Sequence, residues 1–320
     1  MILALIILLG VGIYTYTNRN NIIGQGPGKI HLFPPSGSPS SLHSVSCTTP
    51  DHNPGDSDDA LTSGGLHRTF IVHLPTSYGQ QPQPLVIIYH GYSQSASRIE
   101  QYSGMDAEAD KANFIAVFPQ GVDTPSSWNA GLGAAGPTGS ADDVQFTRDM
   151  LTYLEHNYCI DTHHIYVTGY SLGGGIAYRV ACNLSTQIVA LATVSGAYYH
   201  APGGCNPTRP LPILEFHGQA DRYAPYNGNL SMGMAAVQTY LNVWLNHDQC
   251  NATSQTFFQQ GDVTGIEWTN CAANTVVMHY RISDGGHTWP GADPNPTLGY
   301  TTHVINANDI TWNFFSQYSS

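Results

Sequence analysis

Residues 165–175 read IYVTGYSLGGG, and this stretch decides how the chain folds. Its first residues are apolar or β-branched, which is typical of a short buried strand. A segment with the composition of a helix follows, so the chain must turn sharply around Ser171. Gly169 and Gly173 lack the side chains that would collide in such a turn. The pattern G-x-S-x-G in this context predicts a nucleophile elbow, which exposes the hydroxyl of Ser171 at the start of the helix.

The pattern alone can arise by chance in a chain with 33 glycines, so the segments around it carry weight. Apolar runs that read as strands alternate with helical segments. The expected strands are 69–74, 85–89, 114–118, 165–168, 190–194, 213–217 and 276–282, and the expected helices are 98–113, 143–157, 174–182, 234–246 and 304–318. Continuous apolar strands between helices predict an α/β fold whose mostly parallel sheet is covered by helices on both faces.

Two later segments supply partners for Ser171. A serine hydroxyl is a weak nucleophile that needs a base, and the base needs a carboxylate to orient it. Asp221 lies four residues beyond the expected strand 213–217, at the carboxyl edge of the sheet. His287 lies in a glycine-rich segment after the last expected strand. Because the order Ser, Asp, His is the one used in this context, the three residues are the predicted triad.

Other assignments of the acid and the base stay open at this point. Asp221 can also be an ordinary loop carboxylate that caps a turn, and His303 is a second candidate for the base. Most of the 15 histidines are expected to be surface or structural residues. Asp284 is too close to His287 in the sequence to be the preferred acid.

Acyl transfer also requires donors for the oxyanion. The backbone amide of Leu172, directly after the serine, is one donor that an elbow supplies. The second donor usually comes from the loop after an early strand, where this chain has His90-Gly91-Tyr92. Gly91 lets the backbone turn inward, so the amide of Tyr92 is the predicted second donor.

With these residues in place, the chain resembles the secreted esterases that include feruloyl esterases, acetylxylan esterases and polyhydroxybutyrate depolymerase-like esterases. The segments that match span about residues 65 to 315, and GGHTWPG and FPQG are more specific than the elbow. The matching segments are HGY at 90–92, FPQG at 118–121, SWN at 127–129, DVQF at 143–146, YCID at 158–161, GYSLGGG at 169–175, HGQAD at 217–221 with PY at 225–226, and GGHTWPG at 285–291. The resemblance implies an α/β-hydrolase fold, no metal or other cofactor, and the triad Ser171, Asp221 and His287.

We therefore expect a secreted serine carboxylesterase that removes feruloyl or acetyl groups from plant cell-wall xylan through an acyl-enzyme. A polyester hydrolase of the polyhydroxybutyrate depolymerase type is the alternative, and a non-catalytic hydrolase-fold protein that binds a glycan or partner is a third. The expected partner is thus an acylated polysaccharide or a polyester. The Gly/Ala-rich loop 131–140 differs in length among such esterases, so substrate size transfers least.

Aromatic residues in loops near the expected sheet edge are candidates for substrate binding, because their rings can stack on a sugar or a phenolic acyl group. Trp128, Trp289 and Tyr226 are the chosen candidates. Tyr92, Tyr198, Tyr199 and Tyr223 occupy similar places. The alternative is that at least half of these rings serve loop packing.

Composition limits the class of partner. The 320 residues, 41% of them hydrophobic, suffice for one substantial α/β domain. A net charge of −12, with only two lysines, gives no basic surface for nucleic acid. Tyr, Asn, Thr, Ser and Gly supply the polarity instead, which is common in secreted proteins.

The chain is expected to have three parts. Residues 1–17 are almost wholly apolar, and are interpreted as a signal peptide or an N-terminal membrane anchor. No basic residue precedes the run and no clean cleavage site follows, so both readings stay open. Residues 18–46 are rich in Gly, Pro and Ser and are predicted to be a linker. Residues 47–320 form the catalytic domain, located outside the cell or on its surface.

Six cysteines stand at positions 47, 159, 182, 205, 250 and 271, and none has the spacing of a zinc site. With an export segment in front, three disulfides are expected, although buried free thiols remain the alternative. Six cysteines allow 15 pairings. The first guess is Cys250 with Cys271, which bracket a loop-like stretch. Asn183, Asn229 and Asn251 each begin an N-x-S/T sequon, which matters only in a eukaryotic source.

Overall fold

The structure is a computed structural model that describes residues 52–131, 140–199 and 204–320. The expected signal or anchor segment 1–17, the linker 18–46 and residues 132–139 of the Gly/Ala-rich loop lie outside these ranges. Within them, no helix has both the length and the apolar character needed to cross a bilayer.

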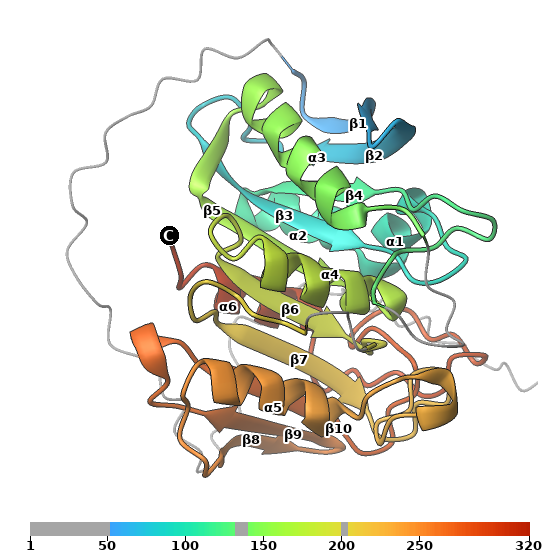
Figure 1. The fold of residues 1–320 in the computed structure, drawn as a ribbon, viewed down its shortest axis with the longest axis vertical. Coiled ribbons are helices and arrows are strands. Elements are labelled where there is room, and N and C mark those ends of the chain that lie inside the picture. The colour runs from blue at the N-terminus through green and yellow to red at the C-terminus, as the bar shows by residue number, and fades with distance from the viewer. Residues whose placement is uncertain (1–51, 132–139, 200–203) are drawn as a thin grey trace, which may run out of the picture. The chain divides into compact units, whose positions relative to one another are not determined.

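The described residues form a ten-stranded sheet with the order β1-β2-β4-β3-β5-β6-β7-β10-β9-β8 (Figure 1). The six central strands, from β4 to β10 in this order, run parallel, and antiparallel strands flank them on both sides. The strands are β1 (Gly55–Ser63), β2 (Leu66–Leu74), β3 (Gln83–Tyr89), β4 (Ile115–Pro119), β5 (Ile160–Gly169), β6 (Ala190–Val194), β7 (Ile213–Gly218), β8 (Gln255–Gln260), β9 (Val263–Trp268) and β10 (Val277–Ile282). The predicted parallel α/β sheet is confirmed.

Helices cover both faces of this sheet (Figure 1). Residues of α3, α4 and α5 share one buried cluster with the sheet, and residues of α1, α2 and α6 share the other. The helices are α1 (Ala96–Ser103), α2 (Met105–Ala112), α3 (Asp143–Asn157), α4 (Leu172–Asn183), α5 (Val237–His247) and α6 (Ala307–Phe315). Two apolar cores on opposite faces explain why the central strands are apolar on both sides.

The structure differs from the sequence prediction in two places. The single helix expected at 98–113 is two helices, because Gly104 adopts the left-handed conformation that ends α1 and precedes α2. Strands β1, β8 and β9 were not predicted. In β1 the less exposed positions are Gly, Ser, Asp, Leu and Ser, so the alternating hydrophobic pattern of a strand is absent.

Candidate active site

The turn between β5 and α4 is a strained nucleophile elbow. Ser171 has φ 58° and ψ −123°, a conformation that residues with a side chain rarely adopt. A Cβ atom at Gly169 would collide with the carbonyl of Gly173, and one at Gly173 would collide with the carbonyl of Tyr89 at the end of β3. Because only backbone fills these places, the two glycines let β3, β5 and α4 fix the serine in its strained position.

The three residues of the predicted triad lie in hydrogen-bond contact. The Ser171 Oγ is 2.8 Å from Nε2 of His287, and Nδ1 of His287 is 2.7 Å from Oδ2 of Asp221. His287 and Asp221 are both buried. A carboxylate only accepts, so Nδ1 carries the ring proton and leaves Nε2 free to accept the proton of the serine hydroxyl.

Two loops at the carboxyl ends of neighbouring strands bring the acid and the base together. Asp221 follows β7 and His287 follows β10, and these strands pair in parallel. The amide of Ala220 donates to the carbonyl of Gly285 at 3.0 Å. A Cβ at Gly218 would collide with that same carbonyl, so glycine is required for the loops to approach.

Asp221 is surrounded by donors. Its Oδ1 accepts hydrogen bonds from the amides of Tyr223 (2.8 Å) and Ala224 (2.9 Å). Nε2 of the buried His217 lies 3.5 Å from its Oδ2, the same oxygen that contacts His287. Burial alone would disfavour the charged carboxylate, but these histidines hold the pKa of Asp221 well below its usual range. The carboxylate of Asp221 therefore stays ionised.

His90 shapes the loop that precedes Tyr92. Its Nε2 accepts from the amide of Gly121 at 2.9 Å, and its Nδ1 donates to the carbonyl of Gly91 at 2.7 Å. Burial lowers the pKa of His90 to about 4, so the ring is neutral, as these two contacts require. Trp128 Nε1 donates to the His90 carbonyl at 2.8 Å. Sequence reasoning chose this segment for the Tyr92 amide and missed His90 as the residue that shapes it.

Both predicted oxyanion donors are available. A Cβ at Gly91 would lie 3.2 Å from the Cβ of Ser171, so this loop borders the serine. Among the described residues, the amide of Tyr92 has no hydrogen-bond acceptor. Leu172 is the first residue of α4, and the amides of a first helical turn have no partner within the helix. The two amides thus remain candidates for binding an oxyanion.

The prediction that Trp128 and Trp289 contact the substrate is wrong. Their exposed fractions are 0% and 1%, and Trp289 Nε1 donates to Asn308 at 2.7 Å, so both rings are packing residues. The Tyr226 side chain is half-buried, and its hydroxyl contacts Nε2 of His279 at 2.9 Å, inside the protein. A buried and an exposed loop aromatic have the same sequence signal, which is why the choice failed.

Other aromatic rings do reach the surface beside the triad. Tyr223 is 55% exposed, and its ring centroid lies 5.3 Å from that of His287. Tyr92, next to Gly91, and Tyr300 are exposed as well. The backbone carbonyl of Tyr300 accepts a hydrogen bond from the amide of Gly286, directly before His287. Among the described residues, these three exposed tyrosines are candidates for contact with a bound substrate.

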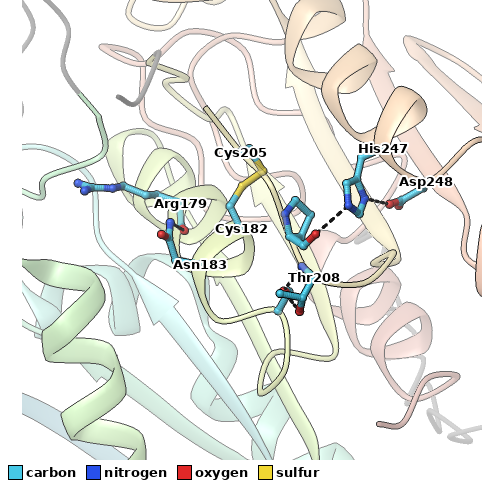
Figure 2. The surroundings of a disulfide bond; sticks show 9 residues. Arg179, Cys182, Asn183, Cys205, Thr208, His247 and Asp248 are labelled. Carbon is cyan, nitrogen blue, oxygen red and sulfur yellow. Dashed lines mark hydrogen bonds and ion pairs between the residues drawn. A yellow bond between two sulfur atoms is a disulfide. The ribbon is translucent and has the colours of Figure 1, made fainter. Parts of the chain in front are cut away.

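Disulfides are present at the far end of α4 and after α5. Cys182 pairs with Cys205, as Figure 2 shows, and Cys250 pairs with Cys271. The predicted pairing of Cys250 with Cys271 is confirmed. Cys159 is disulfide-bonded as well. Over the part of the chain that is described, no group of three or more His, Cys, Asp or Glu residues is arranged to hold a metal ion.

The chain is similar to known proteins in both sequence and fold. A family model described as phospholipase/carboxylesterase matches residues 76–257. The chain belongs to this family. An acetyl xylan esterase from Aspergillus awamori superposes with a TM-score of 0.58 at 14% identity, over 81% of this chain and 99% of the other. The α/β-hydrolase fold is thereby confirmed.

Several characterised or named esterases are similar in sequence. Feruloyl esterase B of Piromyces equi is 32% identical over 69% of this chain, and this chain spans 42% of its length. The putative esterase NocK of Nocardia uniformis subsp. tsuyamanensis is 27% identical over 77% of this chain and 76% of its own. The bifunctional acetylxylan esterase/xylanase XynS20E of Neocallimastix patriciarum is 24% identical over 82% of this chain and 35% of its own. This family thus includes proteins much longer than the matched region.

Proposed function

We propose that this chain is a serine carboxylesterase, with Ser171 as nucleophile, His287 as general base and acid, and Asp221 as the orienting acid. The observation that carries the proposal is the unbroken contact from Ser171 Oγ through His287 to Asp221 at a strained elbow. A nucleophile, a base and an orienter within hydrogen-bond reach form the arrangement that acyl transfer needs.

The reaction proceeds in two halves. Ser171 Oγ attacks the ester carbonyl carbon while its proton passes to Nε2 of His287. The imidazolium then protonates the departing alkoxide, which leaves an acyl-serine and the alcohol. A water molecule next gives a proton to Nε2 and attacks the acyl carbon, and the returning proton releases Ser171 and the carboxylic acid. Asp221 keeps the proton on Nδ1 and stabilises the imidazolium in both halves.

The amides of Leu172 and Tyr92 are proposed to donate to the oxyanion in both tetrahedral intermediates. Their positions flank Ser171, one in its own helix and one in the loop against its Cβ. Fixed donors of this kind stabilise charge that appears only in the transition state. Losing one such donor costs on the order of 100- to 1,000-fold in rate.

The proposed substrates are feruloyl or acetyl esters of plant cell-wall xylan. Relatives named feruloyl esterase and acetylxylan esterase support this class. Exposed Tyr223 beside the base is suited to pack against a sugar or a phenolic ring. This ring takes the place that sequence reasoning gave to the two buried tryptophans.

An extracellular site of action is proposed with it. Disulfides such as Cys182–Cys205 and Cys250–Cys271 persist in oxidising compartments. Residues 1–17 are proposed to direct export or anchor the chain, residues 18–46 to act as a linker, and residues 47–320 to form the catalytic domain.

Product release from three substrates tests the proposal. The full chain is incubated with methyl ferulate, acetylated xylan and polyhydroxybutyrate, and products are separated by chromatography. Ferulate or acetate release supports the proposal, and hydroxybutyrate alone replaces it with a polyester hydrolase. No product from any substrate, together with no labelling of Ser171 by a fluorophosphonate, indicates a binding protein instead. A Ser171→Ala variant controls for contaminating activity.

A further inference from the structure

A second layer of buried ionisable groups stands behind the triad acid. Glu215 and His217 are two residues apart on β7, so their side chains leave the same face of the sheet. Glu215 pairs across strands with His279 of β10. All three are at most 1% exposed. The triad acid lies at one end of this layer, since Asp221 contacts His217.

His217 has an acceptor at each ring nitrogen. Its Nδ1 lies 2.8 Å from Oε1 of Glu215, and its Nε2 lies 2.8 Å from the carbonyl of Ala224. The same Nε2 is 3.5 Å from Oδ2 of Asp221. Carbonyl and carboxylate oxygens have no proton to give, so both ring nitrogens must carry protons. His217 is therefore an imidazolium wedged between two carboxylates.

Glu215 is built to remain an anion. Its Oε1 accepts from the hydroxyl of Tyr198 at 3.1 Å as well as from His217. Its Oε2 lies 2.6 Å from Nδ1 of His279, a charge contact without hydrogen-bond alignment. Burial opposes charge on Glu215 and on His217. His279 and His217 nevertheless lower the pKa of Glu215, and Glu215 and Asp221 raise the pKa of His217.

We infer that His217, kept doubly protonated by Glu215, is a positioning residue that tempers the negative charge of Asp221 and so keeps His287 a free base at more acidic pH. The inference rests on the proposed function, because it concerns the same triad. An unopposed Asp221 would attract a proton to His287 more strongly. A cation near the same oxygen of Asp221 reduces that attraction without removing the hydrogen bond that orients the His287 ring.

The ionisable groups that face this layer come from each packed element. They are Glu215 of β7, Asp221 and Tyr226 in the loop after it, His279 and Arg281 of β10, His287 in the following loop, Tyr198 after β6, and Tyr240 of α5. Arg281 pairs with His217 across the two strands and adds a second positive charge to this face. Glu215 partly offsets the cation, but it lies farther from His287 than His217 does along this chain of contacts. The net effect on His287 is therefore that of the nearer positive charge.

The pH dependence of fluorophosphonate labelling at Ser171 tests the inference. In this reaction Oγ displaces fluoride from phosphorus while His287 takes its proton, so the rate follows the free base and needs no known substrate. In Glu215→Gln and His217→Gln, we expect the midpoint of the acid limb to rise by about half a unit to one unit. A purely structural role would lower the labelling rate equally at every pH.

His247→Gln is the matched control. The ring nitrogens of His247 also face acceptors, Asp248 Oδ1 at 2.6 Å and the Pro207 carbonyl at 2.9 Å, drawn as dashed lines in Figure 2. This pair belongs to a different part of the molecule and should leave the midpoint unchanged. Midpoints that stay at the wild-type value in both Glu215→Gln and His217→Gln overturn the inference while labelling itself upholds the proposed function. Absence of labelling in the wild type rejects the proposed function instead.

Ring protonation of the unaltered protein provides a second readout, in case either buried variant fails to fold. An ordinary histidine is neutral at pH 8. His247 has an acceptor at each ring nitrogen as well, so its ring can give the same signal. In nitrogen-15 spectra at pH 8, we therefore expect a doubly protonated ring that persists in His247→Gln. If every such ring is missing, or the only one is lost in His247→Gln, the inference is overturned.

Discussion

Strand β7 has a histidine–aspartate pair at each end, and the two pairs are chemically unlike. At its carboxyl end, Asp221 lies 2.7 Å from Nδ1 of His287. At its amino end, Asp248 lies 2.6 Å from Nδ1 of His247 and accepts from the amide of Leu211, just before the strand. The contacts are nearly equal in length. The difference lies in what each Nε2 faces.

Nε2 of His287 faces the hydroxyl of Ser171, which can give up a proton, whereas Nε2 of His247 faces the Pro207 carbonyl, which cannot. The nitrogen of His247 must hold its proton, so it cannot serve as a base. A histidine–aspartate contact is therefore no sign of a catalytic site until the partner of the second nitrogen is known.

The two aspartates also titrate in opposite directions. Burial raises the pKa of Asp248 to about 6, because its hydrogen bonds from His247 and the Leu211 amide do not offset the loss of hydration. Asp221 is buried too, yet the imidazoles of His217 and His287 hold its pKa below its usual range. Both carboxylates are buried, so the second imidazole, and not burial, accounts for the lower pKa of the proposed catalytic carboxylate.

The largest expected effect is the loss of the nucleophile. Ser171→Ala should lower turnover on the order of a million-fold, because the remaining groups cannot form an acyl-enzyme. Initial rates on methyl ferulate measure it, and circular dichroism checks that the fold is kept. A variant with correct fold and wild-type turnover would show that the elbow is not the site.

The next effect compares the two ends of β7 directly. Asp221→Asn should lower kcat about 10,000-fold, because an amide no longer fixes the ring proton of His287 on Nδ1. Asp248→Asn is the matched change at the amino end. It should leave kcat within about twofold, because Asp248 lies at the other end of β7 from the proposed triad and does not contact the reacting groups. Similar losses of kcat in both variants would show that the two histidine–aspartate pairs do not differ in function.

A smaller effect is expected at the exposed ring beside the base. Tyr223→Ala should raise KM about fivefold with little change in kcat, since one aromatic contact is worth about 1 kcal/mol. Steady-state kinetics on methyl ferulate measures both constants. Trp244→Phe is the control, because this fully buried ring of α5 should alter stability and leave KM unchanged.

The smallest effect on rate is expected at the far end of α4. Removing the disulfide in Cys182→Ala/Cys205→Ala should leave kcat within about twofold but lower the free energy of unfolding by about 3 kcal/mol. The bond closes a loop between positions 23 residues apart, at the opposite end of α4 from the elbow. Urea unfolding measures the change. A large loss of kcat without loss of stability would couple this end of the helix to the site.

The sequence predicted the parallel sheet and the three residues that the structure brings together, because apolar strands and the glycine-bordered Ser171 and His287 are local signals. Burial is a property of the whole fold, and so Trp128 and Trp289 were assigned to the wrong role. The layer at Glu215 and His217 was missed for a similar reason. Glu215 was read only as part of a buried strand, and His217 as the end of that strand and the start of the HGQAD segment. No local pattern shows that β10 lies beside them.

The glycines of the elbow and of the loop after β7 have an evolutionary consequence. Gly169, Gly173 and Gly218 each abut a backbone carbonyl, and a carbonyl occupies the same space whichever residue carries it. No substitution in a neighbour can make room for a larger residue at these positions. The rings of Tyr223 and Tyr300 are exposed and free of that constraint. Single mutations at these tyrosines can thus change which substrates bind, whereas no series of single mutations can replace the three glycines.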